Sequence, residues 1–178
     1  MHAGRSFDGE VFAATDVHYL PSGGARAVAV VAADAAFCHL LADRIELVAE
    51  VRPYVPGQFY LRELPPLHAV LDGLEGLRLL IIDGYADLDP AGRPGLGAYA
   101  QAEFGVPVVG VAKTAFRTAI HAVPVIRGER STRPLFVTAA GMPCQDAADL
   151  VRGMAGRYRL PDALRRADAL ARGHPPSS

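Results

Sequence analysis

The stretch LRLLIIDG, residues 77–84, is a continuous apolar run that ends at Asp83. Such a run suits a β-strand that is buried on both faces of a sheet. VPVVGVA (106–112) has the same character and leads directly into Lys113, the only lysine among 18 basic residues. Residues 95–104, between the two runs, suit a short helix. Together these segments predict strand–helix–strand alternation and an α/β fold.

Three apolar, β-rich segments precede this part of the chain: residues 11–20, 26–33 and 36–51. The turn sequence PSGGA separates the first two, which indicates a hairpin. Residues 65–76 begin with two prolines and carry leucines at helical spacing, so they predict a helix. Three antiparallel strands followed by α/β units predict a mixed sheet.

The C-terminal third predicts further elements. HAVPVI (121–126) and PLFVTA (134–139) have the composition of two more strands. Residues 146–158 have helical periodicity, and a last helix is expected after Pro161. The chain has 178 residues, of which 51% are hydrophobic, and this predicts one globular domain over residues 1–178, ordered over about residues 9–172.

Bulk properties exclude several classes of protein. No apolar run approaches the roughly 20 residues that cross a bilayer, and the start MHAGRSFDGE lacks a signal-peptide core. Two distant cysteines give neither a disulfide framework nor a zinc site. We therefore expect a cytoplasmic protein with no membrane partner, and we expect it to be a monomer.

The net charge of −1 hides an asymmetry. Residues 1–90 carry thirteen acids and six arginines, whereas residues 91–178 carry six acids and twelve basic groups. The first half is thus suited to hold cations and the second to hold phosphates, unless the two halves mix in space.

Three charged residues stand out against apolar surroundings. Asp16 lies inside the first strand, Asp83 ends a buried strand, and Lys113 follows another. In α/β sheets ligands gather at the carboxyl ends of strands, and carboxylates are the oxygen ligands that Mg²⁺ or Mn²⁺ prefers. The alternative is structural: a common Asp-Gly turn at Asp83 and a hydrogen-bonded or edge position for Asp16.

The segment VRPYVPGQFYLRELPPL (51–67) presents Tyr54 on a rigid Pro/Gly loop and places Glu63 just before the predicted helix. An exposed aromatic of this kind can stack on a base or separate base pairs. It can equally belong to a proline-rich connector, with Glu63 favouring a helix start. The residues alone leave both interpretations open.

Six segments together resemble the endonuclease V family. PYVPGQFYLREL-P is similar to its PYIPG…FRE-P signature, and VPVVGVAK is similar to its VPTIGVAK segment. TDV (15–17), IIDG (81–84), RPLFVTAAG and GRYRLPDALRRAD match further family segments in order. The resemblance covers about residues 11–170.

The resemblance implies a ribonuclease H-like fold: a mixed five-stranded sheet flanked by helices, with extra C-terminal strands and helices. It implies a Mg²⁺- or Mn²⁺-dependent endonuclease acting at inosine in DNA or RNA. The expected cut is at the second phosphodiester 3′ to inosine, leaving a 3′-hydroxyl and a 5′-phosphate.

The resemblance also implies roles for individual residues. Asp16, Glu63 and Asp83 match metal-site carboxylates, and Lys113 matches a lysine near the scissile phosphate. A later acid falls on Asp146, with Asp149 as the alternative register. The substrate-binding positions that match the strand-separating wedge and the base pocket are Pro53, Tyr54, Pro56, Gly57 and Gly84.

Three positions depart from the family pattern. Ala86 replaces a second glycine, Asp89 replaces a histidine before proline, and Tyr99 stands where a later histidine is usual. The family's N-terminal helical segment also has no counterpart before residue 11. These changes keep open a diverged member that binds deaminated or structured nucleic acid but cleaves it poorly. An unrelated α/β nucleotide-binding protein is a third hypothesis, and it requires the acids to diverge in space.

Overall fold

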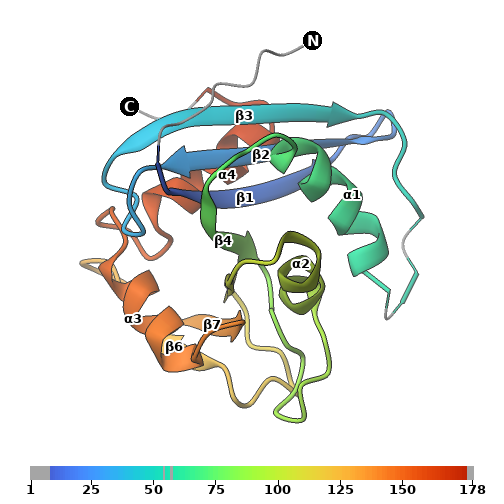
Figure 1. The fold of residues 1–178 in the computed structure, drawn as a ribbon. Helices are drawn as coiled ribbons and strands as arrows, with labels where there is room; N and C mark the ends of the chain where they lie inside the picture. The colour runs from blue at the N-terminus through green and yellow to red at the C-terminus, as the bar shows by residue number, and fades with distance from the viewer. Residues whose placement is uncertain (1–8, 54, 57, 176–178) are drawn as a thin grey trace.

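In the computed structural model, which describes residues 9–53, 55–56 and 58–175, seven strands form one sheet (Figure 1). Their order across the sheet is β3-β2-β1-β4-β5-β7-β6. The strands are β1 (Val11–Tyr19), β2 (Ala25–Ala32), β3 (Leu40–Val48), β4 (Leu77–Asp83), β5 (Val108–Ala112), β6 (Val123–Val125) and β7 (Leu135–Ala140).

The sheet is mixed. Strands β1, β2 and β3 form an antiparallel meander, and β4 pairs in parallel with both β1 and β5. Strand β7 then pairs antiparallel with β5, and β6 pairs antiparallel with β7. Because β1, β4 and β5 all run in the same direction, their carboxyl ends meet at one edge of the sheet.

Two helices cover each face of the sheet. The helices α1 (Tyr60–Leu71) and α2 (Leu96–Phe104) pack on one face, and α3 (Cys144–Gly153) and α4 (Asp162–Ala171) pack on the other. Helix α1 lies over β2 and β3, whereas α4 lies over β1 and β2. Within the described part of the chain, no helix is both long and apolar enough to cross a bilayer.

The core explains the apolar runs in the sequence. Leu80 and Ile82 of β4 face the α1/α2 layer, while Leu79 and Ile81 face the α3/α4 layer. All four side chains are buried. A strand covered on both faces needs apolar residues at successive positions, which is the pattern of residues 79–82.

The predicted α/β fold with a mixed sheet is confirmed. The three-stranded meander is present, although its third strand is shorter than the predicted 36–51. The two additional C-terminal strands do not stand apart from the five-stranded core, because β7 and β6 continue the same sheet beyond β5.

Two helix boundaries differ from those predicted. Helix α1 begins at Tyr60 instead of 65, because amides of its first turn already bond to the Phe59 carbonyl, and Pro65 and Pro66 lie inside it. Helix α3 ends at Gly153 instead of 158. Met154 is extended, and the next amide donates to the Ala36 carbonyl at 2.7 Å.

Candidate active site

Asp16 and Asp83 occupy neighbouring positions on the central parallel strands. In the pairing of β1 with β4, Thr15 lies opposite Ile82. Asp16 directly follows Thr15 and Asp83 directly follows Ile82, so the two aspartates lie at matching positions on the two strands. Because side chains alternate along a strand, both aspartates share the face of the residues two positions before them. Those residues, Ala14 and Ile81, pack in the α3/α4 layer.

Lys113 lies beside them at the end of the next parallel strand. Val111 of β5 is paired with Asp83, and Lys113 follows two residues later. Its Nζ donates to Asp83 Oδ2 at 2.6 Å, and both side chains are about one-third exposed. The single lysine of the chain is thus an ammonium held against a strand-end carboxylate, within reach of solvent.

Glu63 lies in the first turn of α1 and is only 7% exposed. The Tyr19 hydroxyl, at the end of β1, donates to Glu63 Oε1 at 2.5 Å. The guanidinium carbon of Arg62 lies 3.5 Å from the centre of the Tyr19 ring. A strand-end phenol and a stacked arginine therefore fix the position of this buried carboxylate.

The site carboxylates repel one another. Burial, followed by repulsion from Asp83 and Asp168, raises the pKa of Asp16 from 3.8 to about 6. Burial raises the pKa of Glu63 from 4.5 to about 7; the Tyr19 hydrogen bond opposes that rise, and Asp16 adds to it. Two acids that titrate near neutrality, each raised by neighbouring negative charge, are typical of a functional site.

The site favours the charged form of Lys113, whereas it favours the neutral forms of Asp16 and Glu63. Partial burial lowers its pKa, but the hydrogen bond and charge of Asp83, together with Asp168 and Asp16, raise it more, and the net shift is upward. The ammonium is therefore fully protonated at neutral pH.

Asp168 is a further acid near this cluster, and no local sequence pattern singled it out. It lies on α4, which packs against β1, and its charge acts on both Asp16 and Lys113. Its Oδ1 accepts a hydrogen bond from Arg172 Nε at 3.1 Å. The signal was present in the sequence, because the matched stretch GRYRLPDALRRAD ends on this residue.

The structure does not bring Asp146 to this cluster. It is an exposed residue in the first turn of α3, and that helix packs on β6 and β7. The alternative, Asp149, is also exposed and pairs with Arg152 on its own helix. Neither is among the charges that shift the pKa of Asp16, Glu63 or Lys113.

The predicted substrate-binding positions are only partly described. Pro53 and Pro56 are exposed, whereas Tyr54 and Gly57 lie outside the described residues. Gly84 follows Asp83 with a φ of +136°, and a Cβ built on it would meet no atom within 4 Å. Open space therefore borders the carboxylates at Gly84.

The donor chemistry of the cluster fits a hard divalent cation. Carboxylates that raise one another's pKa gain from a nearby positive charge, and their oxygens suit Mg²⁺ or Mn²⁺. Within residues 9–53, 55–56 and 58–175, however, no three acid, histidine or cysteine side chains form a ready-made metal site. Asp83 is paired with Lys113 and Glu63 with Tyr19, so a cation would have to compete with these two partners.

Comparisons with known proteins agree with one another. The family model described as endonuclease V matches residues 3–124. The endonuclease V of Streptomyces avermitilis is 30% identical over 177 residues, covering 88% of this chain and 77% of the relative. That of Azotobacter vinelandii is 31% identical over 182 residues, covering 90% and 81%.

Solved structures show the same fold. The crystal structure of the Streptomyces avermitilis endonuclease V superimposes with a TM-score of 0.75 at 28% identity, covering 96% of this chain and 83% of that one. Ciona intestinalis endonuclease V, solved with a 23mer DNA containing an inosine followed by a ribo-adenosine, gives a TM-score of 0.79 at 17% identity, covering 93% and 85%. On the family model and these relatives, the chain belongs to the endonuclease V family and is a nuclease.

Proposed function

We propose that this protein is a divalent-metal-dependent endonuclease that acts at inosine in DNA or RNA. The proposed cut is at the second phosphodiester 3′ to the inosine, with a 3′-hydroxyl and a 5′-phosphate as products. The observation that carries the proposal is the convergence of Asp16, Asp83 and Lys113 at one edge of the sheet, with a buried Glu63 whose pKa the charges of Asp16 and Asp83 raise. The Ciona intestinalis relative in complex with inosine-containing DNA supports the choice of lesion.

Asp16, Glu63 and Asp83 are the residues that would hold Mg²⁺ or Mn²⁺, with Asp168 as the additional acid in place of Asp146. Such an ion supplies a Lewis acid for the phosphoryl oxygen and a lower pKa for the attacking water. Its positive charge would also keep Asp16 and Glu63 ionised at neutral pH, where burial and repulsion otherwise favour their protonated forms.

Lys113 would act on the phosphate. Its ammonium is protonated and partly exposed beside Asp83, so it would contact a phosphate oxygen bound next to that carboxylate. There it would stabilise the charge that develops during the displacement. An arginine carries the same charge on a larger planar group and does not replace a compact ammonium.

The experiment uses an end-labelled strand with one inosine, made as DNA and as RNA, incubated with Mg²⁺, Mn²⁺ or EDTA. We expect metal-dependent cutting one nucleotide beyond the inosine, reduced at least about 100-fold by Asp83→Asn. A matched control is Asp72→Asn, which neutralises an acid at the C-terminal end of α1. Cutting that persists in EDTA, or equal activity of Asp83→Asn and the wild type, would rule the proposal out.

A second candidate is a diverged member that binds deaminated nucleic acid but cleaves it poorly. The Lys113–Asp83 pair favours it, because the ammonium occupies a carboxylate that catalysis requires for the cation. Tight binding of the inosine strand without cutting in either metal would support this candidate over the first.

A further inference from the structure

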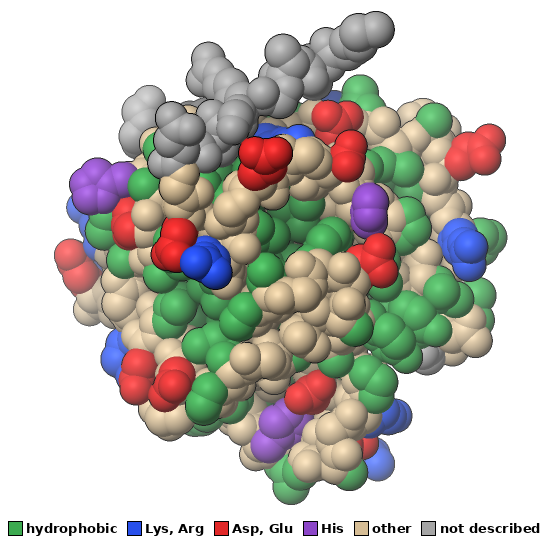
Figure 2. All heavy atoms as spheres, in the orientation of Figure 1, with side chains coloured by type: hydrophobic (Ala, Val, Ile, Leu, Met, Phe, Trp, Pro, Cys, Tyr) green, Lys and Arg blue, Asp and Glu red, His purple; other side chains and the backbone are tan. Residues whose placement is uncertain are grey.

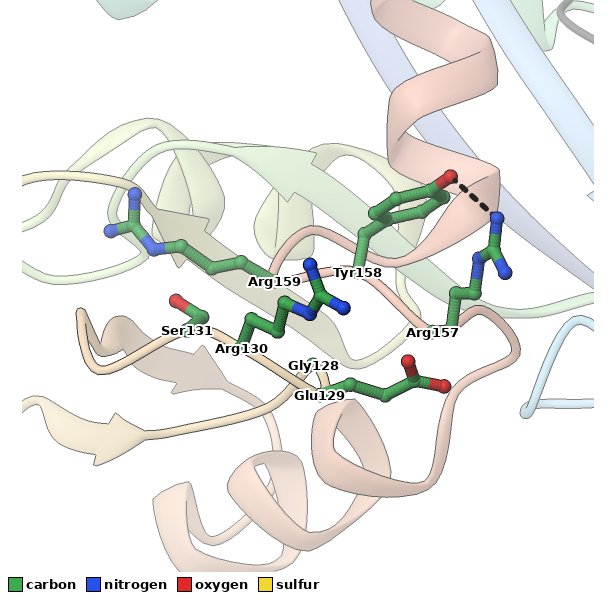
Figure 3. Close-up of a pocket in the computed structure, with 7 residues that line it drawn as sticks. All are labelled: Gly128, Glu129, Arg130, Ser131, Arg157, Tyr158 and Arg159. Carbon is green, nitrogen blue, oxygen red and sulfur yellow. Dashed lines mark hydrogen bonds between the residues drawn. The ribbon is translucent and has the colours of Figure 1, made fainter.

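A hollow of about 540 Å³ lies between two segments of the C-terminal half, residues 128–131 and 157–159 (Figure 3). We call it the arginine hollow. Arg130, Arg157 and Arg159 line it, together with Tyr158 and the single acid Glu129. In the close-up, Arg130 reaches across the space between the two segments.

The walls of the arginine hollow are tied together. Arg127 donates to three carbonyl oxygens of residues 154–158 at 2.6 to 3.0 Å, and the Glu129 amide donates to the Arg157 carbonyl at 3.2 Å. Gly128 has a φ of +92°, and a Cβ on it would come within 2.8 Å of the opposite backbone. The backbones of the two segments are therefore held in a fixed arrangement.

The positive charge of the hollow is not balanced by ion pairs. Among the described residues, six other arginines pair with an acid, as Arg78 does with Glu10. Arg130 and Arg157 pair with no acid in that part of the chain. On the face shown in Figure 2, charged side chains of both signs are scattered between apolar ones. An unbalanced cluster of arginines favours a phosphate ligand.

The hollow adjoins the active site through Arg159. The Nη2 of this residue donates to the Lys113 carbonyl at 2.5 Å and to the Pro134 carbonyl at 2.7 Å. Lys113 in turn contacts Asp83. A strand bound at the carboxylates would therefore pass close to the arginine hollow.

Tyr158 adds an aromatic surface to the hollow. It is 45% exposed, with the guanidinium carbon of Arg165 4.0 Å from its ring centre and that of Arg157 5.2 Å from it. Its hydroxyl accepts a hydrogen bond from Arg157 at 3.2 Å. Basic groups beside an exposed aromatic ring are typical of surfaces that bind single-stranded nucleic acid.

We infer that the arginine hollow binds the phosphodiester backbone of the strand being cut, at a phosphate other than the scissile one. This inference rests on the proposed nuclease function and adds a second contact region to it. The contact is with phosphate, so it carries no base information and acts on strands with or without inosine.

The test compares Arg130→Ala/Arg157→Ala with Arg130→Lys/Arg157→Lys. Arg44→Ala/Arg78→Ala is the control, since it removes two positive charges outside both regions. The dissociation constants of a labelled inosine strand and its unmodified counterpart are measured in EDTA by fluorescence anisotropy, at several salt concentrations. We expect the Ala pair to weaken binding of both strands about 10-fold or more. The salt slope, which is the slope of the logarithm of the binding constant against the logarithm of the salt concentration, should fall in magnitude by about 1.4, since each phosphate contact with a single strand contributes about 0.7.

The Lys pair keeps its charge and should retain most of the salt slope, which separates loss of charge from misfolding. Equal affinity and slope for the Ala pair and the wild type would overturn the inference, as would a loss confined to the inosine strand. If the wild type cuts at inosine and the Ala pair binds unmodified strands normally, only the hollow assignment fails. If the wild type never cuts, but the Ala pair binds both strands more weakly than the wild type does, the assignment of the hollow stands and the proposed activity fails.

Discussion

Tyr19 places a hydroxyl group on a buried site acid, and its removal has a predictable effect. In Tyr19→Phe the ring stays under Arg62, but Glu63 loses the donor that opposes its raised pKa. We expect the Glu63 pKa to rise further, so the acid limb of the pH–rate profile moves to higher pH. The measurement is kcat/KM for cleavage between pH 5 and 9.

A double-variant comparison isolates this effect. In a Glu63→Gln background the phenol no longer faces an ionisable group, so adding Tyr19→Phe should leave the residual profile unchanged. An equal shift of the acid limb in both backgrounds would show that Tyr19 acts elsewhere.

Substitutions of Asp168 and Asp146 test which of the two is the fourth acid of the site. The structure favours Asp168, whereas the match to the family motif predicts Asp146. Asp168→Asn removes a charge that acts on Asp16 and Lys113, whereas Asp146→Asn changes an exposed residue of α3. We expect Asp168→Asn to reduce metal-dependent cleavage about 10- to 100-fold, as is typical for residues that support a metal site. Asp146→Asn should cleave within about 2-fold of the wild type.

Cleavage rates at saturating Mg²⁺ and Mn²⁺ check this prediction. A large loss in Asp146→Asn with normal activity in Asp168→Asn would restore the original register. Normal activity in both variants would leave the site with the three carboxylates predicted first.

The sequence predicts individual site residues when local pattern marks them. Asp16 and Asp83 interrupt or end apolar strands, and Lys113 is the single lysine, so local chemistry alone singles them out. Glu63 needed the family resemblance, because a glutamate near a helix start is common. The place of Asp168 depends on how α4 packs on β1, and no local pattern encodes that contact.

At the scale of elements, the loop after β4 shows how the departures from the family pattern are accommodated. Asp89 Oδ1 accepts hydrogen bonds from the amides of Ala91 and Arg93 at 3.0 and 3.1 Å, so this acid stabilises its own turn. Ala86 is fully buried. Tyr99 stacks on Tyr60 with ring centres 3.6 Å apart, which joins α2 to the start of α1.

Strand β7 anchors this loop beneath the site. The Thr138 hydroxyl is fully buried and accepts a hydrogen bond from the Ala86 amide at 2.8 Å. Thr138→Val leaves that amide buried without an acceptor, so we expect the free energy of unfolding to fall by about 1–3 kcal/mol. Because the loop begins at Gly84, beside the carboxylates, the KM for cleavage should also rise.

Urea unfolding and steady-state cleavage measure the two effects of Thr138→Val. Thr138→Ser keeps the oxygen and is the matched control, so it should retain most of the stability and the wild-type KM. If Val and Ser variants behave alike, the hydrogen bond does not hold the loop.

Element types could be predicted because their periodicity is local, but their ends could not. Pro65 and Pro66 suggested a helix start, yet burial of Leu67, Val70 and Leu71 stabilises a helix that already began at Tyr60. The tertiary contact outweighs the cost of proline inside the helix.

At the scale of the whole molecule, the order of strands depends on contacts between distant segments. Strand β4 inserts between β1 and β5, which brings Asp16 and Asp83 together across 66 residues of sequence. The two halves of the chain, which differ in charge, both contribute to the site: the acidic half supplies Asp16, Glu63 and Asp83, and the basic half supplies Lys113, Asp168 and the arginine hollow. The two halves meet at the carboxyl ends of β4 and β5.

We expect this arrangement to make the stability of the whole molecule depend on pH and on metal. Asp16 and Glu63 titrate near 3.8 and 4.5 when unperturbed, and near 6 and 7 in the folded protein. Between these values the folded state binds more protons than the unfolded state. These groups therefore favour folding most at low pH, and their contribution falls as pH rises from about 4 to 7, by about 2–4 kcal/mol in total after solvent screening.

We therefore expect Mg²⁺ to raise the melting temperature of the wild type more at pH 7.5 than at pH 5, because a cation stabilises only the ionised carboxylates. Glu63→Gln should reduce both the pH dependence and the response to Mg²⁺, whereas Glu46→Gln on β3, outside the cluster, should change neither. Thermal unfolding of the three proteins at both pH values, with Mg²⁺ or EDTA, provides the measurement. Equal Mg²⁺ responses of Glu63→Gln and the wild type would show that the cation binds away from these acids, and the metal assignment would then have to move to other residues.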